Sequence, residues 1–96
     1  MRKSNEKPLR LAIEEFLEAF HLKNKMNEAK IVASWEKVVG EMVAKNTKKL
    51  AIRGKILYVQ VESAPLKNEL MYARTKIMNA LNREAGILVI EEIVFN

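Results

Sequence analysis

Cationic side chains gather in the middle of the sequence, where residues 42–61 contain five Lys or Arg and no acidic residue. We call these five the cationic cluster: Lys45, Lys48, Lys49, Arg53 and Lys55. Such a group neutralises phosphates and releases their counterions without reading base sequence. Lysines also protect an exposed hairpin, because they discourage edge-to-edge pairing of strands. The segment therefore predicts a phosphate-binding edge, with a solvated hairpin as the alternative.

Catalytic groups are scarce in this sequence. It contains no Cys, all twelve acidic residues are Glu, and His21 is its single histidine. One copy of the chain therefore cannot form a Ser-His-Asp or Cys-His arrangement, a cysteine-based metal site or a histidine-rich one. The adjacent pairs Glu14-Glu15 and Glu91-Glu92 point in different directions on a helix or strand, unlike paired catalytic carboxylates. We expect a non-enzyme without a metal or other cofactor.

The charge of the whole chain favours an anionic partner. Seventeen Lys and Arg against twelve Glu give a formal net charge of +5. Residues 1–55 carry 13 basic and 7 acidic groups, whereas residues 56–96 carry 4 and 5. This asymmetry is typical of a domain that binds nucleic acid, although net charge also keeps a small protein soluble.

No targeting or membrane segment is expected from the pattern of apolar residues. The apolar stretch 9–20 is interrupted by Glu14, Glu15 and Glu18, which breaks the apolar core that a signal peptide requires. No run approaches the roughly 18 apolar residues of a membrane span. We expect a cytoplasmic protein that does not act at a membrane.

The size of the chain allows one folded unit. Ninety-six residues, 49 % of them hydrophobic, predict a single domain at residues 7–96, preceded by a disordered segment at residues 1–6. Apolar residues at three-to-four spacing predict a helix ending near Phe20, and we expect a loop at residues 23–25. A second helix is expected at about residues 27–46, with Trp35 in its buried stripe.

Beyond the second helix the apolar period changes from 3.6 to 2. Two β-prone runs around Gly54 predict a tight hairpin, in which Leu57, Val59 and Val61 face the core and Tyr58 lies on the opposite face. A third helix follows from about Ser63 to Gly86, and residues 87–95 predict a closing strand. The fold class is α+β in the order α-α-β-β-α-β, with three helices against one face of a three-stranded sheet.

The predicted closing strand is apolar on both faces. Three helices do not readily cover both faces of a sheet, so we expect one face to remain exposed. The residues expected there are Ile56, Tyr58, Ile90 and Val94. Such a face would bind a partner protein or a second copy of the chain. The alternative is that the helices wrap further and cover it.

Several landmarks follow one another along the chain: Trp35-Glu36-Lys37-Val38-Val39-Gly40, then Asn46-Thr47, then Gly54-Lys55-Ile56-Leu57-Tyr58-Val59-Gln60-Val61-Glu62-Ser63, and finally Ile93-Val94-Phe95. Over about residues 9–95, this ordered set resembles the DciA family of bacterial proteins. The resemblance implies a KH-like α+β domain that acts in DNA replication, binds DNA and helps to load the DnaB-type replicative helicase.

The chain departs from true KH domains in one respect. Those domains clamp the nucleic-acid backbone with a Gly-x-x-Gly loop, whereas the glycines here stand alone at positions 40, 54 and 86. Any contact with nucleic acid must therefore depend on Lys and Arg. The leading hypothesis is an adaptor that binds DNA through the cationic cluster and assists the helicase, and the sequence leaves RNA open as another ligand. The alternative is a protein-interaction module or homodimer that uses the apolar sheet face and binds no nucleic acid.

Overall fold

The computed structural model describes the backbone of residues 2–96 and the side chains of residues 7–96. Its elements are α1 (Arg2–Val39), α2 (Glu41–Lys45), β1 (Thr47–Arg53), β2 (Ile56–Val61), α3 (Ala64–Tyr72), α4 (Arg74–Ala85) and β3 (Glu92–Phe95). The strands form one mixed sheet in the order β1-β2-β3, with β1 antiparallel and β3 parallel to β2. The α+β class and the three-stranded sheet are confirmed, and the predicted third helix is divided at Ala73 into α3 and α4.

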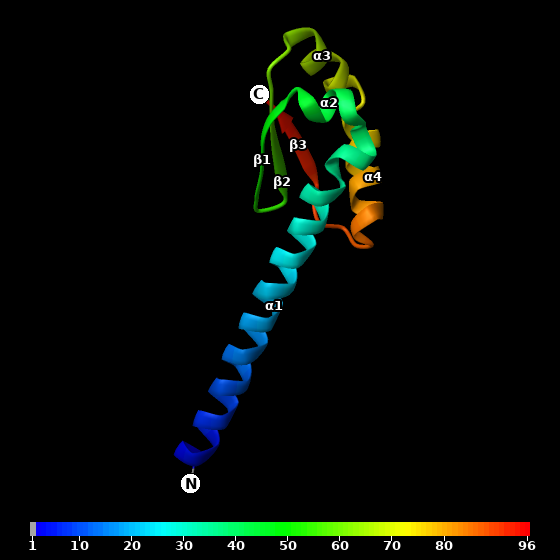
Figure 1. The fold of residues 1–96 in the computed structure, drawn as a ribbon. Helices are drawn as coiled ribbons and strands as arrows, with labels where there is room; N and C mark the ends of the chain where they lie inside the picture. The colour runs from blue at the N-terminus through cyan, green and yellow to red at the C-terminus, as the bar shows by residue number, and fades with distance from the viewer. Residues whose placement is uncertain (1) are drawn as a thin grey trace.

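The core lies between the helices and one face of the sheet (Figure 1). Its most deeply buried side chains are Ile31, Leu57, Val59, Leu81, Ile90 and Ile93. Trp35 belongs to this core at 3 % exposure, as the apolar spacing predicts. Alternation along β2 also places Leu57, Val59 and Val61 on the core side, as predicted.

Helix α1 is continuous, so the predicted loop at residues 23–25 is wrong. Lys and Asn are tolerated inside a helix, and no Gly or Pro occurs between Leu9 and Val39 to interrupt the hydrogen bonds. The helix also extends back through Pro8 to Arg2. Met1 and the side chains of residues 1–6 lie outside the described part, so the disordered segment at residues 1–6 stays a prediction.

Gly40 ends α1 and redirects the chain into α2. Its φ of +92° lies in a region that favours glycine, because a Cβ would strain the backbone there. Across this turn, Trp35 Nε1 donates a hydrogen bond to Thr47 Oγ1 at 3.0 Å, and that hydroxyl donates to the Val43 carbonyl at 2.8 Å. The buried indole thus joins α1, α2 and β1.

The closing strand is shorter than predicted because a buried amide controls the segment before it. Asn82 Nδ2 donates to the Ile90 carbonyl at 2.9 Å, and the backbone N–H groups of Val89 and Ile90 donate to Asn82 Oδ1 at 2.9 and 3.0 Å. These bonds hold residues 87–91 outside the sheet, and β3 begins only at Glu92. Ile90 is completely buried as a result, so its prediction as a residue of the exposed sheet face is wrong.

The first half of α1 projects from the rest of the molecule (Figure 1). The molecule measures 67 × 22 × 19 Å, and its radius of gyration is 18.2 Å. A compact chain of this length would have a radius of about 12 to 13 Å. The difference arises from the projecting helix, whose side chains from Lys7 to Met26 are all exposed.

Candidate nucleic-acid interface

The face of the sheet turned away from the core carries part of the cationic cluster. The register of β1 and β2 pairs Lys49 with Gln60, Ala51 with Tyr58, and Arg53 with Ile56. All of these lie opposite the core-facing side chains, because successive residues of a strand alternate between faces. Tyr58 therefore occupies the outer face, as predicted.

An open hollow lies on this outer face. It has a volume of about 260 Å³ and is lined by Lys49, Ala51, Arg53, Tyr58, Gln60 and Asn96. Two cations on β1 and one aromatic ring on β2 thus border the same depression. We call this surface the outer hollow.

Lys48 differs from Lys49 in its pairing on β1. The register shifts between Thr47 and Lys49, so Lys48 occupies an irregularity in β1 and has no partner residue in β2. Together with Lys49 it lines a groove between α1 and the edge strand β1, where Val32 and Trp35 form the opposite wall. The cationic cluster therefore spreads from the outer face around the edge of the sheet.

The two ends of the cluster are ion-paired. Lys45 Nζ lies 3.1 Å from Glu41 Oε1, one helical turn away, and Lys55 Nζ lies 3.5 Å from Glu91 Oε1. All four side chains are about two-thirds or more exposed, and such pairs contribute little to stability. Among the described side chains, Lys48, Lys49 and Arg53 take part in no ion pair. These three are the cations most available to an anionic ligand.

The predicted apolar face is less apolar than the sequence suggests. Ile56, Tyr58 and Val94 do share the outer face, but each is only partly exposed. Lys49, Arg53, Gln60, Glu92 and Asn96 surround them. A surface with this many polar and charged groups differs from the dry, apolar centre of a protein–protein interface.

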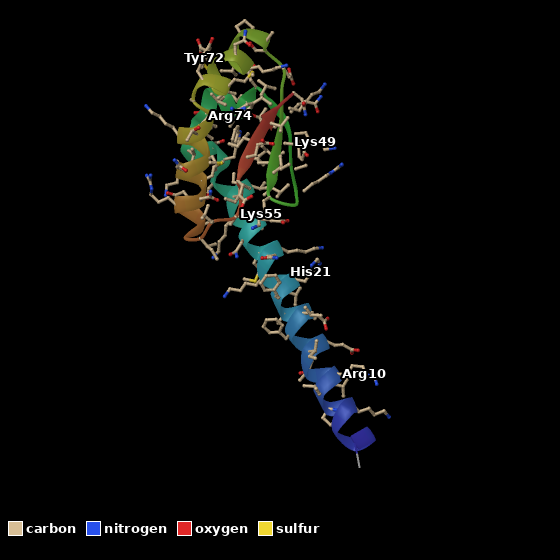
Figure 2. The ribbon with its side chains drawn as sticks, turned by 180° about the vertical axis from the view of Figure 1, so that it is seen from behind. Arg10, His21, Lys49, Lys55, Tyr72 and Arg74 are labelled. Atoms are coloured by element: carbon tan, nitrogen blue, oxygen red, sulfur yellow. The ribbon has the colours of Figure 1, made fainter. Side chains whose placement is uncertain are left out.

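A second aromatic and basic surface escaped the sequence analysis. Tyr72, at the end of α3, is 94 % exposed, and Arg74 begins α4 beside it (Figure 2). With Asn68 and Met71 they line an open hollow of about 460 Å³. The available signal was the position of Tyr72, which falls outside the buried stripe through Leu70 and Ile77.

The described residues give little support for a metal site or a membrane-spanning helix. No group of three or more His, Cys, Asp or Glu side chains is placed to hold a metal ion. No helix in the described part of the chain is long and apolar enough to span a membrane.

The fold and its surface define the class of protein: a small α+β domain whose open sheet face carries polar and cationic side chains. The family follows from sequence comparison, in which the family described as "Dna[CI] antecedent, DciA" matches residues 8–95. The chain therefore belongs to the DciA family, which confirms the resemblance. This family consists of bacterial DNA-replication proteins of the helicase-loader type, which are adaptors and not catalysts. No curated protein matches the chain in sequence.

Proposed function

We propose that the chain is a cytoplasmic adaptor that binds DNA through the cationic cluster while assisting the replicative helicase. The observation that carries the proposal is the placement of Lys48, Lys49 and Arg53, three cations outside the ion pairs of the described side chains, along one edge strand. Lys45 and Lys55 extend this surface at its two ends. A DNA phosphate can replace Glu41 or Glu91 at little cost, because both ion pairs are solvent-exposed.

The spacing of the cations suits a nucleic-acid strand. Lys49 and Arg53 are four residues apart on β1, or about 13 Å at the rise of a β-strand. A DNA strand rises about 3.4 Å per nucleotide, so the two side chains reach different phosphates. A run of phosphates can therefore follow the edge of the sheet.

The position of Tyr58 favours single-stranded DNA as the ligand. Its ring borders the outer hollow between the two cations. An unpaired base can stack on the exposed part of this ring, whereas a base inside a duplex cannot leave its neighbours without an energetic cost. We therefore expect tighter binding to single-stranded than to double-stranded DNA.

The direct test is a fluorescence-anisotropy titration of labelled single- and double-stranded DNA across a salt series. If all five cations contact phosphates, log K should fall by about 3 to 5 units per decade of salt. The triple variant Lys48→Glu, Lys49→Glu, Arg53→Glu should lose at least 100-fold in affinity at low salt, because three attractive contacts become repulsive. Its unfolding midpoint should stay close to that of the parent, since all three side chains are exposed.

A matched control separates local contacts from net charge. Lys30, Lys76 and Arg83 are exposed and form no ion pair among the described side chains. Changing these three to Glu alters the net charge by the same amount, from +5 to −1. The control should lose far less affinity than the triple variant, and equal losses would contradict the proposed placement of the site.

The helicase part of the proposal rests on the family and has its own measurement. A purified DnaB-type helicase should co-elute with the parent chain in size-exclusion chromatography. Co-elution of the triple variant as well would place the helicase contact outside the cationic cluster. The alternative function, a protein-interaction module acting through Ile56, Tyr58 and Val94, would be favoured if no DNA binds at 50 mM salt while the helicase still binds.

A further inference from the structure

The projecting half of α1 carries a continuous apolar stripe that no other described side chain of this chain covers. Its members are Leu9, Ile13, Phe16, Leu17 and Phe20, which are between 50 % and 67 % exposed. They follow one another at three- and four-residue spacing and therefore lie on one side of the helix. We call this surface the α1 stripe.

The same side of the helix continues into the core. Ile31, Trp35 and Val38 extend the spacing of the stripe, and there the sheet and α4 cover it. Between the two parts, the stripe passes through Asn24 and Asn27. The domain therefore covers one end of the apolar side and leaves the other end in water.

The area of the stripe is large for an exposed surface. Each of these side chains presents about 200 Å² when fully exposed, so the stripe amounts to roughly 600 Å². Monomeric proteins seldom expose a contiguous apolar patch larger than a few hundred Å². Two such stripes facing each other would bury about 1,200 Å², which reaches the size of a specific interface.

We propose that the occupant of the α1 stripe is the α1 stripe of a second copy, in an antiparallel helix pair. A two-fold axis between positions 14 and 15 places Leu9 at the level of Phe20, and Ile13 at the level of Phe16. Two layers, Leu9 with Phe20 and Ile13 with Phe16, then combine one aliphatic and one aromatic side chain, and Leu17 lies at the level of Ala12. A parallel pair would place Phe against Phe and leave the other layers under-filled. Antiparallel packing therefore fills the interface more evenly.

The acidic side chains of the projecting helix lie outside the proposed contact. The acidic residues Glu14, Glu15 and Glu18 lie outside the stripe and remain in water when it is covered. Ala12 and Ala19 flank the stripe on one side, where small side chains allow two helices to approach. Because these charges lie outside the contact, the fit of the apolar layers sets the orientation of the pair.

The projecting helix cannot cover its own stripe. Helix α1 has no interruption before Gly40, so residues 9–20 cannot fold back onto the domain without breaking it. Phe16 and Phe20 already stack on each other with their ring centroids 6.3 Å apart, which leaves their outer faces to a partner. The proposal needs no nucleic acid and is independent of the proposed function.

The test is light scattering coupled to size-exclusion chromatography on the full chain, over a concentration series in 1 M salt. Two leucines make a matched pair: Leu17 in the stripe and Leu22 on the far side of the helix are both 57 % exposed. The parent and Leu22→Glu should have twice the mass of one chain. Leu17→Glu should raise the dissociation constant at least 100-fold, because each copy loses a buried leucine and gains a charge.

Disulfide cross-linking tests the orientation of the two helices separately. No native Cys can interfere, because the chain contains none. A mixture of Leu9→Cys and Phe20→Cys chains should form the mixed disulfide on oxidation, and neither variant should cross-link efficiently with itself. Cross-linking of each variant with itself would overturn the antiparallel arrangement. A parent that stays monomeric at 100 μM, including one that binds lipid vesicles through the stripe, would overturn the dimer. Equal effects of Leu17→Glu and Leu22→Glu on the dissociation constant would also overturn the proposed dimer.

Discussion

The two halves of α1 present the same apolar side to different surroundings. Ile31 and Trp35 are 0 % and 3 % exposed, whereas Ile13 and Phe16 are 50 % and 67 % exposed. Both halves satisfy the same periodicity, and one uninterrupted set of helical hydrogen bonds joins them. The comparison teaches that spacing identifies the apolar side of a helix without identifying what covers it.

The largest expected effect comes from making the same substitution, Ile to Ala, in each half of α1. Ile31→Ala should reduce the free energy of unfolding by about 2 to 5 kcal/mol, because it leaves a cavity in the core. Ile13→Ala should change it by less than about 0.5 kcal/mol when measured at concentrations at which the chain is monomeric. Urea unfolding followed by circular dichroism measures both values. Similar losses would mean that the projecting half is also packed against the domain.

A second prediction concerns the place where α1 leaves the domain. Residues 87–89 and the hairpin tip lie there beside Asn24, Asn27 and Glu28. Asn82 Oδ1 accepts hydrogen bonds from the backbone N–H groups of Val89 and Ile90 and so holds this segment in place. Asn82→Ala should cost about 2 to 3 kcal/mol, because it leaves buried backbone groups without partners. Hydrogen exchange at Val89 and Ile90 should accelerate in the variant.

The control for this substitution lies on the same helix. Asn79 is exposed, so Asn79→Ala should leave both stability and exchange close to those of the parent. If Asn82→Ala were equally mild, the buried amide would not be what holds residues 87–91 outside the sheet.

The smallest expected effect concerns the ion pair at the buried end of α1. Lys37 Nζ lies 2.7 Å from Glu84 Oε1 and joins α1 to α4, but the two side chains are 71 % and 32 % exposed. Lys37→Ala should therefore cost at most about 1 kcal/mol. A double-mutant cycle with Glu84→Ala isolates the pair. A coupling well above that value would show that the ion pair, and not apolar burial alone, fixes the angle between the helices.

Much of the fold could be predicted from the sequence because local periodicity governs it. The change from helical to strand spacing after Asn46, the turn at Gly54 and the core position of Trp35 are all local signals. The loop predicted at residues 23–25 failed because a short polar stretch can also lie inside an exposed helix. The closing strand was predicted too long because Asn82, seven or eight residues away, provides the hydrogen bonds that would otherwise join the sheet.

The candidate site was less accessible to prediction. The sequence located the cationic cluster but could not show that Lys48 occupies an irregularity in β1, since this depends on the register with β2. The contact between Lys55 and Glu91 joins residues 36 positions apart and carries no local signal. The position of Tyr72 outside the buried stripe through Leu70 and Ile77 was a local signal of its exposure that was not used.

The continuity of α1 gives the proposed dimer a fixed length. A helix rises about 1.5 Å per residue, so the 16 or 17 residues between the two-fold axis and Ile31 span about 25 Å. The two domains would then stand about 50 Å apart, held by a stiff rod and not by a flexible linker. At about 3.4 Å per nucleotide, this distance corresponds to roughly 15 nucleotides. The helix would set a fixed distance between the two domains, and DNA shorter than roughly 15 nucleotides would contact only one domain at a time.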